Sequence, residues 1–141
     1  MIPNIPEKTG IQENRGHTLT DDFITRTYVL PLLTDPESKA RLVAEHKNNP
    51  IGVPGKAGKA AVGHSEDLIR VIDKLRRQPM PGKYVRVCVN PHEGYCIGIV
   101  SGVRGQPVEI LRDETYPSED ACEHAIFVRR VANLLAAYGF D

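Results

Sequence analysis

The segment KYVRVCVNPHEGYCIGIV, residues 83–100, decides the fold that this sequence predicts. In its first part, three valines alternate with Tyr84, Arg86 and Cys88, and a period of two is typical of a β-strand with two different faces. Residues 90–94, NPHEG, have the composition of a turn, and YCIGIV follows as a second strand. The sequence therefore predicts an antiparallel hairpin.

The length of the turn predicts the register of this hairpin. With five residues in the turn, Cys88 lies opposite Cys96, and the valines of the first strand share a face with the apolar residues of the second. Because this pairing gathers the apolar side chains on one face, we expect it to be the native register. Tyr84 and Arg86 then lie on the outward face of the sheet.

Helical patterns occupy the chain before the hairpin. The first begins at Thr20 and continues to Pro31, which ends or bends it because proline lacks a backbone N–H. A capping box in TDPE, residues 34–37, starts a second helix that stops before Asn49. Ser65, which two acidic residues follow, caps a third helix.

A third strand and a long helix follow the hairpin. The strand is PVEIL, residues 107–111, and Ser118 caps a helix over 119–137 that Gly139 stops. We expect three apolar side chains of this helix to pack on the sheet: Phe127, Val128 and Val131.

The predicted fold class is α+β, with N-terminal helices followed by a three-stranded antiparallel meander that a long C-terminal helix packs. Residues 1–19 lack periodicity and are expected to form an extended arm. Residues 20–141 are expected to form one domain, with a helical part at 20–78 and a ββ-β-α part at 83–138.

Composition limits the classes of function. The 141 residues carry 18 basic and 18 acidic side chains, so no overall charge attracts nucleic acid or an anionic membrane. No apolar run reaches the roughly 20 residues that span a bilayer. The three cysteines lack the spacing of a secreted disulfide framework. We therefore expect a cytoplasmic protein that does not act at a membrane.

A glycine-rich segment, NPIGVPGKAGKAAVGHSED at residues 49–67, raises the question of phosphate binding. A P-loop needs Gly-Lys followed by Ser or Thr after a strand, whereas Gly58 and Lys59 precede Ala60 and follow a helical pattern. We interpret the segment as a connection between two helices. Lys56 and Lys59 either contact an acidic partner or remain solvated.

Cysteine and histidine side chains are the candidates for a metal site or a nucleophile. Cys88, His92 and Cys96 form the alternative set of zinc ligands, but their spacing differs from a Cys-x2-Cys knuckle, and we predict no metal site. Cys122 and His124 stand two residues apart on a helix, so their side chains diverge by about 200° and cannot pair directly. We expect no catalytic residue in this chain.

A basic cluster surrounds the start of the first strand: Arg76, Arg77, Lys83 and Arg86. Such a cluster can bind nucleic acid, yet the aromatic side chains that stack on bases are scarce, with Tyr84 alone on that face. We therefore do not expect nucleic acid as a partner. The cluster is interpreted as a basic edge that faces solvent or a partner protein.

Three blocks occur in a fixed order: AEHKNNPIG at 44–52, LRRQPMPGKY at 75–84 and YPSEDACEHAIFVRRV at 116–131. In this order and spacing they resemble the small subunit of N,N-dimethylformamidase, over residues 40–135. The similar positions are His46, Asn49, Pro50, Gly52, Arg76, Gln78, Pro79, Gly82, Lys83, Tyr84, Glu119, Ala121, His124, Ala125, Phe127, Arg129 and Arg130.

The resemblance implies a heteromeric amide hydrolase that splits a substituted formamide into formate and an amine. It implies that a large subunit carries a mononuclear iron and the chemistry, while this chain holds no cofactor and stabilises or shapes that subunit. Two alternatives stay open: a stand-alone binding or regulatory module for nucleic acid or a small metabolite, and a small zinc or thiol enzyme.

We expect one surface of this chain to contact the large subunit. Arg129 and Arg130 point about 100° apart on their helix, so both cannot lie in the core, and arginine is favoured at interfaces. The alternative for these arginines is an ion pair with Glu119 or Glu123 within the chain. The predicted interface residues are Tyr84, Arg86, Arg129, Arg130, His46 and Lys83.

Overall fold

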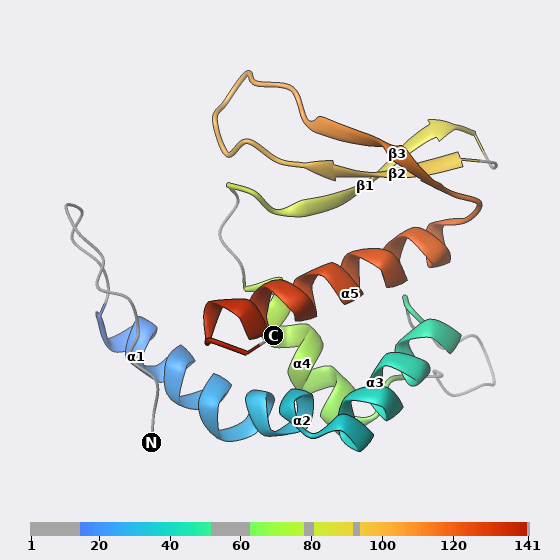
Figure 1. Ribbon diagram of the computed structural model, residues 1–141. Helices are drawn as coiled ribbons and strands as arrows, with labels where there is room; N and C mark the ends of the chain where they lie inside the picture. The colour runs from blue at the N-terminus through green and yellow to red at the C-terminus, as the bar shows by residue number, and fades with distance from the viewer. Residues whose placement is uncertain (1–14, 52–62, 78–80, 92–93, 141) are drawn as a thin grey trace, which may run out of the picture.

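The computed structural model describes residues 15–51, 63–77, 81–91 and 94–140. Helical segments precede a three-stranded sheet and a long helix follows it, so the predicted α+β class is confirmed (Figure 1). The elements are α1 (Arg15–Ile24), the π-helical segment η1 (Thr25–Val29), α2 (Leu30–Thr34), α3 (Pro36–Asn48), α4 (Glu66–Arg76), β1 (Tyr84–Asn90), β2 (Gly94–Ile99), β3 (Glu109–Tyr116) and α5 (Glu119–Ala137).

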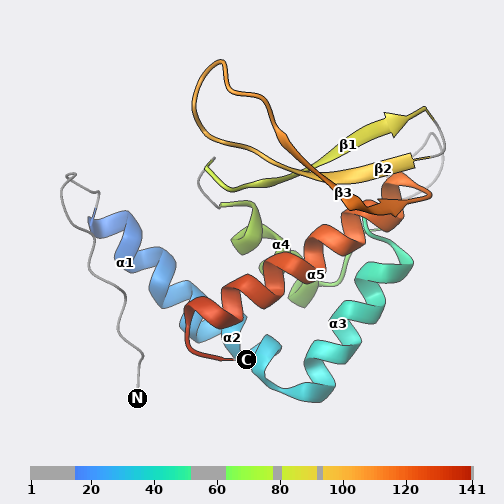
Figure 2. The same ribbon diagram turned by 45° about the horizontal axis from the view of Figure 1, so that its top comes forward.

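Helix α5 lies between the sheet and the N-terminal helices (Figures 1 and 2). It contacts all three strands on one side, and α2, α3 and α4 on the other. An α-helix turns by about 100° per residue, so neighbouring residues of α5 can face different layers. This central position makes α5 the element that both layers share.

Two apolar clusters fill the interior, one on each side of α5. The cluster beneath the sheet consists of Ile97, Cys122 and Ile126. The larger cluster joins the helices and includes Val29, Leu33, Leu42, Leu68, Val71, Phe127, Val131 and Leu135. The prediction that Phe127, Val128 and Val131 pack on the sheet is therefore wrong. Ile126 and Cys122 face the sheet instead, and Val128 is 43% exposed.

The N-terminal helices form a continuous run that proline shapes without ending. Pro31 is the second residue of α2 and cannot donate a backbone hydrogen bond to the preceding turn, and the π-helical segment η1 lies directly before α2. Asp35 caps α3 by accepting a hydrogen bond from the Ser38 N–H at 3.1 Å, with Pro36 in the first turn. The cap thus lies one residue later than a capping box starting at Thr34 predicts.

Serine caps start the two helices that follow, as predicted. The Ser65 hydroxyl accepts a hydrogen bond from the Leu68 N–H, and the Ser118 hydroxyl accepts one from the Ala121 N–H. Both helices carry acidic residues in the first turn, and the positive end of the helix dipole stabilises these negative charges. Gly139, with φ of 84°, follows the end of α5.

The sheet is an antiparallel meander in the order β1-β2-β3, but the register of its hairpin differs from the prediction. Cys88 pairs with Tyr95, and Val87 pairs with Cys96. The cause is a bulge between Cys88 and Asn90, which places an extra β1 residue opposite β2 and shifts all the earlier pairs by one.

This shift reverses the faces of β1. Tyr84 packs under the sheet with Ile97, and Arg86 reaches carboxylates of α5, whereas both were predicted to point outward. The valines take the outer face, where a Cβ added at Gly98 would lie 2.8 Å from Val87 and 2.5 Å from Val108. Only glycine fits at this position without displacing those side chains.

Several predictions concern residues that the structure does not describe. They are the extended arm up to residue 14, the glycine-rich connection at 52–62 and His92. Helix α1 begins at Arg15, within the segment 1–19 that was expected to be extended.

Candidate functional site

A charged cleft of about 630 Å³ lies between β1, the end of α4 and α5. It brings together four of the six residues predicted to contact a partner: Lys83, Tyr84, Arg86 and Arg130. Its other lining residues are Arg76, Val85, Cys88, Tyr95, Glu119, Glu123 and Ile126. The convergence follows from the bulge in β1, because it turns Tyr84 and Arg86 toward α5.

Arg86, an exposed residue in the wall of the cleft, pairs with two carboxylates of α5. Its Nη1 lies 3.2 Å from Oε1 of Glu119, and its Nε lies 3.2 Å from Oε2 of Glu123. The two glutamates are four residues apart and therefore share one side of the first turns of α5. Arg86 is thus neutralised within the chain at one end of the cleft.

Arg130 forms the inner wall of the cleft with Tyr84. Its Nη2 donates a hydrogen bond of 3.0 Å to the Tyr84 carbonyl, and Asn133 donates one of 3.0 Å to the Tyr84 hydroxyl. The Arg130 Nε is buried, and no described residue offers it an acceptor. Burial lowers the pKa of Arg130 from its usual value, Glu123 opposes that change, and nearby Arg76 adds to it.

Arg129 points away from this cleft, toward β3. Its Nη2 lies 2.8 Å from the Glu114 carboxylate, which also accepts a hydrogen bond from the Tyr116 hydroxyl. These two hydrogen bonds lower the pKa of Glu114. The ion pair expected within the chain therefore exists, but with Glu114 rather than with Glu119 or Glu123.

His46 lies in the interior, next to the cleft. It is 2% exposed, and its ring stacks on Phe127 with the ring centres 3.9 Å apart. Its Nδ1 is 2.9 Å from the Nδ1 of His124, so one ring donates a hydrogen bond and the other accepts it. Burial lowers the pKa of His46 to about 3, with further contributions from His124, His64 and Arg76. As a buried side chain, His46 offers no surface to a second chain.

The hydrogen bonds that join the end of α3 to the start of α4 were not predicted from the sequence. Glu45 accepts hydrogen bonds of 2.6 Å from both the N–H and the hydroxyl of Ser65, which ties α3 to the start of α4. His64, just before this cap, bonds the Asn49 carbonyl through Nε2. The partners are 15 and 20 residues apart, so no local pattern marks them.

The cysteines do not meet as zinc ligands. Because Cys88 pairs with Tyr95 rather than with Cys96, the two thiols lie on opposite faces of the hairpin. Cys122 lies buried beneath the sheet, and burial raises the pKa of its thiol to about 11. A thiol with such a pKa is a poor nucleophile near neutral pH.

Comparison with protein families assigns the chain. Residues 17–141, which span α2 to α5 and most of α1, match the family described as N,N-dimethylformamidase alpha subunit. The chain therefore belongs to the N,N-dimethylformamidase alpha subunit family, and the resemblance to the small subunit is confirmed. No curated protein matches the sequence.

Within the ranges that the structure describes, no three or more His, Cys, Asp and Glu side chains come together in a way that could hold a metal ion. Of the described helices, none combines the length and the apolar composition needed to cross a bilayer.

Proposed function

We propose that this chain is the non-catalytic small subunit of a formamidase-like amide hydrolase. In this role it stabilises or shapes a large catalytic subunit that uses iron to cleave the C–N bond of a substituted formamide. The family match over residues 17–141 carries the proposal. The complex is proposed to be a hetero-oligomer in the cytoplasm, and the thiols of Cys88, Cys96 and Cys122 are all free, which agrees with a reducing compartment.

The chemistry of the described side chains supports a non-catalytic role. His46 is 2% exposed and hydrogen-bonded to the partly buried His124, so the His46 ring is not presented to a substrate. Cys122 is buried in apolar surroundings. The charged groups that do face a cleft are mostly arginines and paired glutamates, which suit recognition more than bond cleavage.

The test is co-expression of this chain with any large open reading frame that neighbours its gene, followed by gel filtration and an assay of formate release from N,N-dimethylformamide. We expect the two chains to elute together, with activity and iron only in fractions that contain the large subunit. The isolated chain is expected to release no formate. Formate release by the isolated chain, or elution of the two chains as separate species, would refute the proposal.

A further inference from the structure

The cleft beside β1 carries more positive charge than the chain neutralises. Arg86 is paired with Glu119 and Glu123. Within the described ranges, no carboxylate forms an ion pair with three other cations that line the cleft: Arg76, Lys83 and Arg130. Arg76 is the last residue of α4, Lys83 directly precedes β1, and Arg130 on α5 bonds the Tyr84 carbonyl at the start of β1.

The Arg130 guanidinium is incompletely bonded. Its Nη2 donates to the Tyr84 carbonyl, but its buried Nε has no acceptor among the described residues. Buried donors are nearly always satisfied in native proteins, because an unmade hydrogen bond is costly. Arg76 and Glu123 both lie near enough to act on Arg130: Glu123 favours its positive charge and Arg76 opposes it, and Glu123 is already paired with Arg86. The four cations that line the cleft thus outnumber its two carboxylates, Glu119 and Glu123, and an added carboxylate would balance part of the remaining positive charge.

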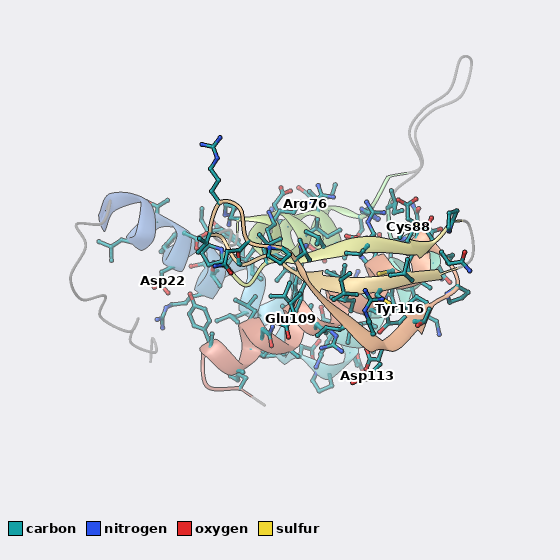
Figure 3. All side chains as sticks on the ribbon, turned by 90° about the horizontal axis from the view of Figure 1, so that it is seen from above. Asp22, Arg76, Cys88, Glu109, Asp113 and Tyr116 are labelled. Atoms are coloured by element: carbon teal, nitrogen blue, oxygen red, sulfur yellow. The ribbon has the colours of Figure 1, made fainter. Side chains whose placement is uncertain are left out.

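The position of the cleft suits a segment of another protein. β1 is an edge strand, and the cleft follows it. Figure 3 shows Arg76 and Cys88 along the β1 side of the molecule, whereas Glu109 and Asp113 lie along the β3 side. Tyr84, fixed by Asn133, supplies a rigid aromatic surface of the kind enriched in interfaces. The three cations and this aromatic ring therefore line the same cleft.

We propose that the cleft receives a carboxylate-bearing segment of the large catalytic subunit, with Arg76, Lys83 and Arg130 as its contacts. This inference rests on the proposed function, because it needs the large subunit as a partner. A planar guanidinium binds a carboxylate through two parallel hydrogen bonds, which matches one or two acidic side chains. A nucleic acid fits less well, since the chain carries 18 basic and 18 acidic side chains and so has no overall charge that attracts a polyanion.

Charge reversal tests this assignment. Arg76→Glu and Lys83→Glu are prepared in the full chain, and their Kd for the large subunit is measured by surface plasmon resonance at low and high salt. Arg104→Glu, on the exposed connection between β2 and β3, is the matched control. We expect each cleft variant to raise the Kd about tenfold or more and to weaken its salt dependence, while the control binds as the wild type does.

The outcomes separate the two proposals. If the wild type binds the large subunit and both cleft variants bind with the same Kd, the carboxylate cleft is refuted while the subunit role stands. If the wild type does not bind the large subunit, the proposed function fails and this inference fails with it. Binding of a fluorescent single-stranded RNA by the wild type, lost in Arg76→Glu, would instead assign the cleft to nucleic acid. Circular dichroism of each variant confirms that it is folded.

Discussion

His46 is a titratable side chain that the fold holds in its interior. Phe127 covers one face of its ring, and His124 occupies its Nδ1. The surrounding groups are themselves basic, with His124, His64 and Arg76 all disfavouring a positive charge on His46. The folded protein therefore keeps His46 neutral at pH values where an exposed histidine would be protonated.

The stability of the protein is expected to fall in acid because of His46. Its pKa is about 3 in the folded state, against about 6.5 in an unfolded chain. Between these values the unfolded state binds more protons, so stability is fully present above about pH 6.5 and is lost as the pH falls toward 3. We expect the free energy of unfolding, measured in urea, to drop by about 2 kcal/mol between pH 7 and pH 4.5.

The variant His46→Gln isolates this contribution. It is less stable at pH 7 because it loses the stacked ring, but its stability should change less with pH over the same interval. His124 also has a lowered pKa through burial, so some dependence remains. If the variant and the wild type lose the same free energy between pH 7 and pH 4.5, His46 is not the group responsible.

Phe127 and Val128 are neighbours whose environments differ. Phe127 is 3% exposed in the helical cluster, whereas Val128 is 43% exposed. Phe127→Ala should cost about 3–5 kcal/mol, because it leaves a cavity and removes the ring that stacks on His46. Val128→Ala, the control, should change stability by no more than about 0.5 kcal/mol. Urea unfolding measures both, and equal losses would contradict this orientation of α5.

At the scale of the elements, the β1 bulge decides which side chains meet. A single extra residue between Cys88 and Asn90 turns Arg86 toward Glu119 and Glu123, and turns the valines outward. Without the bulge, the cleft would lose Tyr84 and Arg86 from its wall. The candidate site therefore depends on the register of the hairpin.

The valines on the outer face of the sheet leave no space for a side chain at position 98 of β2, which is a glycine. A methyl group there would approach Val108 and Val87 closer than van der Waals contact allows. We expect Gly98→Ala to lower the melting temperature, at a cost of about 1–3 kcal/mol. Gly63→Ala is the control, because nothing lies within 4 Å of an added Cβ there. Similar melting temperatures for the two variants would argue against this register.

The sequence predicts those elements whose signals are local. The caps at Ser65 and Ser118 and the span of α5 are readable because each depends on a few adjacent residues. The faces of β1 are not readable, since both alternating sets contain apolar side chains and either could be buried. The same holds for Ile126 and Phe127 on α5, where both faces are apolar and tertiary packing assigns them.

The candidate site was predicted in part. Lys83, Tyr84, Arg86 and Arg130 meet in the cleft, although two of them were expected on the wrong face of the sheet. The burial of His46 could not be foreseen, because nothing in the residues around it indicates its stacking partner, which is 81 positions later (127 minus 46). The packing of α5 against the sheet and the helices brings together residues that are far apart in the sequence, both in the cleft and around His46.

At the scale of the whole molecule, α5 separates two apolar clusters and contributes side chains to both. Ile126 and Cys122 complete the cluster under the sheet, and Phe127, Val131 and Leu135 complete the cluster among the helices. Removing α5 would expose part of both clusters, because it takes away Cys122 and Ile126 from one and Phe127, Val131 and Leu135 from the other. The same helix lines the cleft, because Glu119, Glu123 and Arg130 all belong to α5.

The central place of α5 also has a consequence for synthesis. The helix comes after every other described element in the chain, at residues 119–137. Before α5 has been synthesised, the apolar side chains of the helices and of the hairpin that pack on α5 in the folded protein have nothing to pack against. Both apolar clusters, and the cleft that we assign to the large subunit, are therefore completed only after residues 119–137 have been synthesised.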